Sequence, residues 1–267
     1  TTLIKNKYQT GFKTMKQKIF IFTLMFLSII IAQADHHAGL SEDIVFLMLF
    51  DEMEDGKVMD SSGNDNNGTV FGEGKVDDGK FGKAFYFDGA THISVENSAP
   101  LGMLTNPMSV GAWVKPDALG GWINLVEMDG GAGWKLGFHG DKGLVWTTYF
   151  VKDFMATQPV EEEVWSHVAV TWDGSEATMF INGKEAEGSP ISGGGVINVK
   201  DEPSLDIGYR RTSEDSYFKG FMDELFISNK VLSLDEITKY QAGFKVSATA
   251  VNPRAKLTTT WANIKSY

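Results

Sequence analysis

The chain contains no cysteine. Disulfide bonds, thiolate zinc sites, iron–sulfur clusters and a cysteine nucleophile are therefore excluded. Proline is also scarce, with 7 residues against 29 glycines, a ratio that is typical of a protein with many tight turns. Without disulfides, the fold has to be stabilised by its own hydrophobic core, with or without a bound metal ion.

Basic residues are in the minority. The sequence has 24 lysines and arginines against 35 aspartates and glutamates, which gives a formal net charge of −11. This balance argues against nucleic acid or an anionic membrane as a partner, because phosphate binding needs clustered cations. The surplus carboxylates either serve solubility alone or supply oxygen ligands for a hard cation such as calcium.

Long hydrophobic runs are nearly absent. The exception, residues 19–31, has 13 residues, whereas a membrane-spanning helix needs about 20. Lys16 and Lys18 precede this run and Ala32-Gln33-Ala34 follows it, which is the pattern of a secretory signal with small residues at its cleavage site. We predict cleavage after Ala34; an uncleaved anchor is the alternative.

This signal sets the expected organisation of the N-terminal region. The sequence does not begin with methionine, so we expect translation to start at Met15, with residues 1–14 as an upstream extension and residues 15–34 as the signal peptide. Cleavage would give a secreted, extracytoplasmic protein, and no later segment is apolar enough to span a membrane.

The rest of the chain alternates between short strand patterns and turns. The dipeptides Asp88-Gly89, Asp173-Gly174 and Asn182-Gly183 mark turns, and Asn-Gly between two strands is the strongest short hairpin signal. In the segment 164–172, residues 168, 170 and 172 are expected on one face of a strand. Strands are predicted at residues 44–50, 83–87, 91–96, 108–114, 122–128, 134–138, 164–172, 178–181, 184–186, 204–209 and 217–227.

One short helix is expected near the C-terminus. Ser233 and Glu236 form a capping-box pattern, so the helix should begin after Ser233 and run to about Ala242. We therefore predict a linker at residues 35–43, one all-β domain at residues 44–243, and a polar tail at residues 244–267. Many short strands with Gly and Asp turns favour a sandwich or a closed barrel.

Three stretches of the sequence resemble the laminin-G-like, concanavalin A-like jelly roll. The first contains Leu49-Phe50-Asp51-Glu52 and Phe81-Gly82-Lys83-Ala84-Phe85-Tyr86-Phe87-Asp88-Gly89; the second runs from Val164 to Gly174; the third runs from Gly220 to Ser228. The resemblance implies an all-β, two-sheet antiparallel jelly-roll sandwich. Members of this family mostly bind carbohydrates or proteins, often as accessory modules, but a fold does not fix a function.

The resemblance also implies a calcium ion. Carried over to matching positions, its ligands would be Asp51, the carbonyl oxygen of Gly89 and Asp223, with Asp88 as a further candidate. Calcium accepts carboxylate and carbonyl oxygens, so these residue types are suitable. The alternative is that Asp88-Gly89 only forms a turn and Asp223 only accepts hydrogen bonds. The Asx-rich loop at residues 60–67 is either a second cation site or a self-organised turn.

Aromatic and cationic residues supply the candidate ligand contacts. In this fold the ligand usually lies on the concave face, where flat rings offer platforms for sugar rings. The candidates are Trp122, Trp134, Trp146, Tyr149 and Arg210. The alternative for each aromatic residue is a place in the core, and for Arg210 a place in a solvated turn.

No catalytic residues are predicted, although related jelly rolls include glycoside hydrolases. In the hydrolases of this fold, the acids lie on one strand as E-x-D-x-x-E. The nearest match here begins at Glu127 and has Ala132 at the third acid position. We therefore expect a secreted, non-catalytic recognition module that binds a glycan. An extracellular protein partner is the alternative, and hydrolysis is the least favoured function.

Overall fold

The computed structural model describes residues 40–96, 101, 106–140, 143–198, 203–213 and 215–244. The predictions for the upstream extension, the signal peptide, residues 35–39 and the tail beyond residue 244 lie outside the described residues. Residues Leu40–Phe244 form one compact unit. No helix in the described part of the chain is long and apolar enough to cross a membrane.

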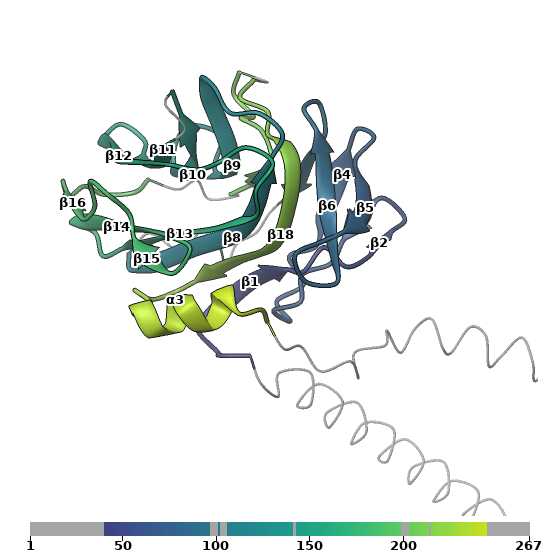
Figure 1. Cartoon of the computed structure of the whole chain (residues 1–267), viewed down its shortest axis with the longest axis horizontal. Helices are drawn as coiled ribbons and strands as arrows, with labels where there is room; N and C mark the ends of the chain where they lie inside the picture. Colours follow the sequence, from purple (N-terminus) through teal and green to yellow (C-terminus); the bar gives the residue numbers. More distant parts are fainter. Residues whose placement is uncertain are drawn as a thin grey trace, which may run out of the picture. The chain divides into compact units, whose positions relative to one another are not determined.

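Two antiparallel sheets make up this unit (Figure 1). The first sheet has the order β15 (Lys184–Glu185), β14 (Glu176–Ile181), β13 (Ser166–Trp172), β8 (Met108–Pro116), β18 (Lys219–Ser228), β6 (Lys83–Asp88) and β5 (Lys75–Asp78). In addition, β1 (Ile44–Met48) pairs with β18, and β16 (Ile191–Ser192) pairs with β14.

The second sheet has the order β12 (Lys152–Pro159), β11 (Gly143–Thr148), β10 (Trp134–His139), β9 (Trp122–Met128), β17 (Leu205–Ile207), β7 (His92–Val95), β4 (Gly68–Phe71), β3 (Lys57–Val58) and β2 (Met53–Glu54). The two sheets confirm the predicted two-sheet antiparallel sandwich. Strand order is non-sequential in both sheets, as a jelly roll requires.

The hydrophobic core lies between the sheets and follows the period of two that strands impose. On β13, Val168, Val170 and Trp172 belong to the core cluster, as predicted, and the side chains between them face the other way. On β10, Trp134, Leu136 and Phe138 point into the core, which leaves Lys135 and His139 on the outward face of the second sheet.

Helix α3 (Leu234–Gln241) covers the outward face of the first sheet. Ser233 and Glu236 form the predicted capping box, and Ile237 and Tyr240 are buried. The ring of Tyr240 lies 5.4 Å from that of Phe226 on β18, and the indole nitrogen of Trp113 on β8 donates a hydrogen bond to the last helical carbonyl group. The outward face of the second sheet has no such helical cover among the described residues.

Candidate ligand-binding face

A row of polar side chains crosses the outward face of the second sheet. Six residues lie directly opposite one another on six successive strands, from β12 to β7, and we call them the polar row: Asp153, Thr147, Lys135, Glu127, Asp206 and Ser94. Neighbouring strands are about 4.8 Å apart, so the row is roughly 24 Å long. Asp153, at the β12 end of the row, is exposed, whereas the other five residues are buried beneath neighbouring side chains.

A strip of rings and cations lies over the row. We call it the aromatic–cation strip, and it consists of Trp122, Lys135, His139, Tyr149 and Arg210. The Lys135 ammonium lies 3.9 Å from the ring centroid of Trp122 and 6.0 Å from that of Tyr149. The ring centroid of His139 is 4.0 Å from that of Trp122, and the guanidinium carbon of Arg210 is 5.7 Å from the ring centroid of Tyr149.

Lys135 belongs to both the polar row and the aromatic–cation strip. It is 5% exposed, and its ammonium makes neither a hydrogen bond nor an ion pair with any residue that the structure describes. Burial lowers the pKa of Lys135, while the negative charges of Asp153 and Glu127 raise it. A nearly buried ammonium with unused donors is costly, because charged groups lose their hydration on burial. A ligand that accepts those hydrogen bonds would remove this cost.

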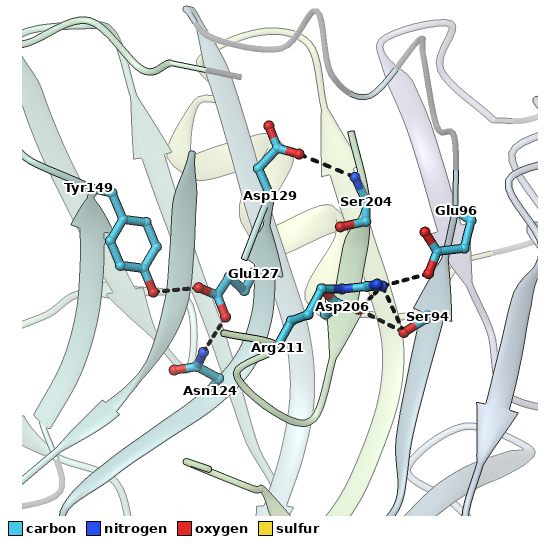
Figure 2. A network of polar contacts seen from close by, with 9 residues as sticks. All are labelled: Ser94, Glu96, Asn124, Glu127, Asp129, Tyr149, Ser204, Asp206 and Arg211. Carbon is cyan, nitrogen blue, oxygen red and sulfur yellow. Dashed lines mark hydrogen bonds and ion pairs between the residues drawn. The ribbon is translucent and has the colours of Figure 1, made fainter. Parts of the chain in front are cut away.

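Glu127 holds Tyr149 of the strip in place through a hydrogen bond (Figure 2). Its carboxylate is fully buried and accepts hydrogen bonds from the Tyr149 hydroxyl group and, at 2.9 Å, from the Asn124 side-chain nitrogen. Burial raises the pKa of Glu127, and the Tyr149 hydrogen bond opposes that rise. The Asn124 side-chain oxygen is also buried and has no hydrogen-bond partner among the described residues.

An ion-pair network fixes the adjacent part of the face (Figure 2). Arg211 donates from Nε and Nη2 to the two carboxylate oxygens of Asp206, both at 2.7 Å, and from Nη2 to Glu96, also at 2.7 Å. Ser94 donates to Asp206. Because Arg210 precedes Arg211, this network also fixes the backbone that carries Arg210 into the strip.

The predicted ligand contacts separate into two groups. Trp122 is 38% exposed, and Tyr149 and Arg210 are half-buried, so all three reach the outward face. Trp134 and Trp146 are fully buried and stack on each other in the core, with ring centroids 5.1 Å apart. They are core residues that no ligand can reach, because their positions on β10 and β11 point inward.

Asp51 and Asp223 of the predicted calcium ligands lie near the same turn of the first sheet. Asp223 accepts hydrogen bonds from the backbone N–H groups of Lys80 and Phe81, both at 2.9 Å, and Asp51 accepts one from Lys83 at 2.8 Å. The negative charge of Asp51 contributes to the raised pKa of Asp223, whose main cause is burial and whose value is about 7.

Glu224 joins these carboxylates, which the sequence analysis did not anticipate. It lies in a bulge of β18 at a φ of 48°, and one carboxylate oxygen accepts a hydrogen bond from the backbone N–H of Phe244. Burial raises the pKa of Glu224 to about 8. Its second oxygen and one oxygen of Asp223 are buried without a hydrogen-bond partner in the described part of the chain.

Asp88 and Gly89 do not share this location. Asp88 pairs with Lys219, four positions before Asp223 on β18, so the two aspartates are separated by roughly 13 Å along the strand. Asp88 instead accepts hydrogen bonds from the N–H groups of Ala90 and Thr91 within its own turn. Within the described ranges, no group of three or more histidines or acidic residues has the arrangement of a metal site. The unpaired oxygens of Asp223 and Glu224 nevertheless have the chemistry that a hard cation requires.

Hydrogen bonds to the Asp60 side chain organise the Asx-rich loop at residues 60–67. The Asp60 carboxylate accepts hydrogen bonds from the N–H groups of Leu47, Ser62 and Asn66 and from the Asn66 side chain, at 2.9–3.1 Å. These four donors occupy both carboxylate oxygens, so the second of the two predicted roles for this loop, a self-organised turn, agrees with the contacts.

Glu127 also has a carboxylate neighbour that sequence reasoning missed. Asp206 lies directly opposite it on β17. Both carboxylates are fully buried; Asp206 is paired with Arg211, and Glu127 accepts from Tyr149 and Asn124. A hydrolytic pair needs one carboxyl group that reaches the scissile bond and another that reaches the anomeric carbon or a water molecule. Neither of these carboxylates is exposed for such a role.

The two antiparallel sheets and their non-sequential strand order define a jelly-roll sandwich. The family model for the concanavalin A-like lectin/glucanases superfamily matches residues 87–238. The chain belongs to this superfamily. No curated protein sequence matches the chain.

Solved structures with the same fold include a domain of an enzyme and binding domains of toxins. Domain 4 of AbnA, a GH43 extracellular arabinanase from Geobacillus stearothermophilus solved with arabinotriose, is 23% identical, with a TM-score of 0.61 and coverage of 74% of this chain and 97% of the domain. The binding domain of botulinum neurotoxin DC was solved with SialylT (13% identity, TM-score 0.58) and with rat synaptotagmin II (16% identity, TM-score 0.55). In both, 76% of this chain covers 52% of the toxin domain. At these identities, the likeness establishes the fold alone.

Proposed function

We propose that this protein is an exported, non-catalytic recognition module that binds a glycan on the outward face of the second sheet. The observation that carries the proposal is the aromatic–cation strip above the polar row. An exposed indole ring, a phenol ring and two cations without acid partners among the described residues lie side by side there. Sugar rings stack on such aromatic surfaces, and their hydroxyl groups need donors and acceptors at the ring edge.

The fold relatives support this proposal in part. The AbnA domain was solved with arabinotriose and the neurotoxin domain with SialylT, so jelly rolls of this kind accommodate saccharides. Glu127 and Asp206, the neighbouring carboxylates of this face, are both enclosed by their own partners, which supports a binding role rather than hydrolysis.

We further propose that calcium binds at the first sheet, where it would stabilise the fold. Asp223 and Asp51 would supply carboxylate oxygens, and Glu224 has an unpaired oxygen of the same kind beside them. Asp88 and Gly89 would not take part, because they lie at the other end of β6. When bound, calcium would neutralise the clustered negative charge and satisfy the unpaired oxygens.

The glycan proposal is tested by a ligand screen followed by titration of one variant. Immobilised neutral and acidic oligosaccharides are screened, and the best ligand is titrated calorimetrically against the wild type and Trp122→Ala. Loss of stacking is expected to weaken binding at least about tenfold, on the scale of 1–3 kcal/mol per stacked ring. Phe71→Ala is the matched control, since Phe71 is an exposed aromatic residue at the far end of the same sheet. Equal weakening by both variants, or by neither, would contradict the proposed location.

A protein partner is the second candidate, and it is favoured by an apolar tip on the β11–β12 hairpin. Phe150 is 89% exposed at a φ of 63°, and Val151 and Val196 are 39% and 72% exposed. Gly195, which precedes Val196, lies against the Val151 side chain. If adhesion is the function, Phe150→Ser abolishes cross-linking to proteins on intact cells and Trp122→Ala does not. The glycan proposal predicts the reverse for saccharide binding.

A further inference from the structure

The polar row, the aromatic–cation strip and the residues beside them carry charges of both signs. Lys135 and Arg210 are the cations, and Glu127, Asp153 and Asp215 are the acidic groups whose charges act on Lys135. The neighbouring network adds Arg211 against Asp206 and Glu96. A ligand on this face therefore meets both signs of charge, with acids in excess.

The excess of acidic groups affects which sugars can bind to this face. A carboxylate or sulfate group placed near Lys135 would also lie near Asp153 and Glu127, which flank that lysine in the row. Like charges at close range are unfavourable, and a partly buried setting strengthens the repulsion. A hydroxyl group has no net charge, and it both donates and accepts hydrogen bonds. It can therefore use an ammonium and a carboxylate that lie next to each other.

The Lys135 ammonium has hydrogen-bond donors that no described residue accepts. Its acidic neighbours already have partners: Thr147 donates to Asp153, and Tyr149 and Asn124 donate to Glu127. The ammonium group, in contrast, has ring contacts but no acceptor among the described residues. Because Lys135 is only 5% exposed, packing fixes the position of its side chain.

Resting on the proposed glycan function, we propose that this face selects neutral, hydroxyl-rich glycans over acidic ones, and that Lys135 determines the selection. Lys135 donates hydrogen bonds to sugar hydroxyl groups while its ammonium remains between the Trp122 and Tyr149 rings. Asp153 and Glu127 hold the ammonium charged and exclude carboxylated or sulfated sugars.

The test compares two probes on three proteins. The probes are arabinotriose, which is neutral, and trigalacturonic acid, which carries carboxylates; the proteins are the wild type, Lys135→Met and Lys152→Met. Lys152→Met is the matched control because it removes the same charge from the same sheet. Lys152 also lies over a ring, at 5.1 Å from Phe154, but its ammonium has an acceptor in Ser192.

The proposal expects the wild type to bind the neutral probe at least about tenfold more tightly than the acidic one. It expects Lys135→Met to lose about tenfold or more of that neutral affinity, the usual scale for a hydrogen bond to a charged group. Lys152→Met should leave it unchanged. Lys135→Gln replaces the methionine variant if thermal unfolding shows that the latter does not fold.

Other results separate the two proposals. A wild type that prefers trigalacturonic acid, or a Lys135→Met variant that keeps its neutral affinity, would overturn the role of Lys135 while leaving glycan binding intact. A wild type that binds no saccharide in the wider screen would instead remove the proposed function itself. A specificity change in Asp153→Asn, with gained affinity for the acidic probe, would support charge exclusion as the mechanism.

Discussion

The ionisation of Asp223 and Glu224 makes a strong prediction about stability. Burial raises the pKa of Asp223 to about 7 and that of Glu224 to about 8. The folded protein therefore holds protons on these carboxyl groups at pH values where the unfolded chain has released them. Stability falls with pH wherever the native state binds more protons. In the absence of metal, the contribution of these two groups to the free energy of unfolding should thus be fully present below about pH 4, should decrease as pH rises, and should be lost above about pH 8.

The magnitude follows from the size of the pKa change. A change of one pKa unit corresponds to about 1.4 kcal/mol, so ionising Asp223 alone in the folded state costs on the order of 4 kcal/mol. The cost of ionising Glu224 as well is not simply added, because each charge raises the pKa of the other. About half of this loss, roughly 2 kcal/mol, falls above pH 5.5, and the whole loss is a large part of the 5–15 kcal/mol that stabilises a typical domain.

Calcium should reverse this loss. Urea unfolding is measured at about pH 5.5 and about pH 8.5, each with a chelator and with excess calcium; a ligand at a hundredfold excess over its dissociation constant adds about 2.7 kcal/mol. We expect a large calcium effect at the higher pH, a small one at the lower pH, and neither in Asp223→Asn. Asp77→Asn is the control, since Asp77 is on the exposed edge strand β5. Metal-free stability that does not fall between these pH values would refute the reasoning, and a calcium effect that is absent at both would remove the ion.

Three further predictions concern the fold. Ser233→Ala removes the helix cap and should lower the free energy of unfolding by about 1 kcal/mol in urea; no change would mean that α3 does not depend on its capping box. Trp134→Ala should cost about 3–5 kcal/mol as a core truncation, whereas Trp122→Ala should cost less than about 1 kcal/mol, and equal thermal shifts would contradict their assigned environments. Asp60→Ala leaves several N–H groups without an acceptor and should lower stability by about 2–4 kcal/mol, a loss that added calcium should not alter.

The parts of the fold that were predicted from sequence depend on local signals. Asn182 and Gly183 adopt the positive φ angles that a tight hairpin requires, and Ser233 with Glu236 forms the helix cap. In such cases a few neighbouring residues determine the backbone, so the sequence pattern is sufficient.

The hairpin of β11 and β12 was not predicted because its turn lacks those signals. Its tip is Tyr149-Phe150-Val151, without glycine, proline, asparagine or aspartate, and Phe150 takes the positive φ instead. Phe50 also has a positive φ, of 59°, just after β1. The apolar run predicts a strand to Phe50, but the strand ends at Met48. Neither position has a residue type that favours positive φ, so a sequence pattern does not reveal these conformations.

The site was harder to predict than the fold for a similar reason. Lys135 follows Trp134, which was the predicted ligand contact on this strand. The alternation along β10 instead places Lys135 outward and Trp134 inward. The pairing of Glu127 with Asp206 depends on strand order, which brings together segments that are far apart in sequence. The converse holds for Asp88 and Asp223, which lie on paired strands but at different positions along them.

Binding of a glycan on the outward face of the second sheet is tested most directly by mapping backbone amide chemical shifts during titration with the best saccharide from the screen. We predict that the largest changes cluster on β9, β10 and β11 and at Arg210, and that they are absent from the β11–β12 tip at Phe150 and from α3. Changes confined to that tip, or to the first sheet around Asp223, would contradict it.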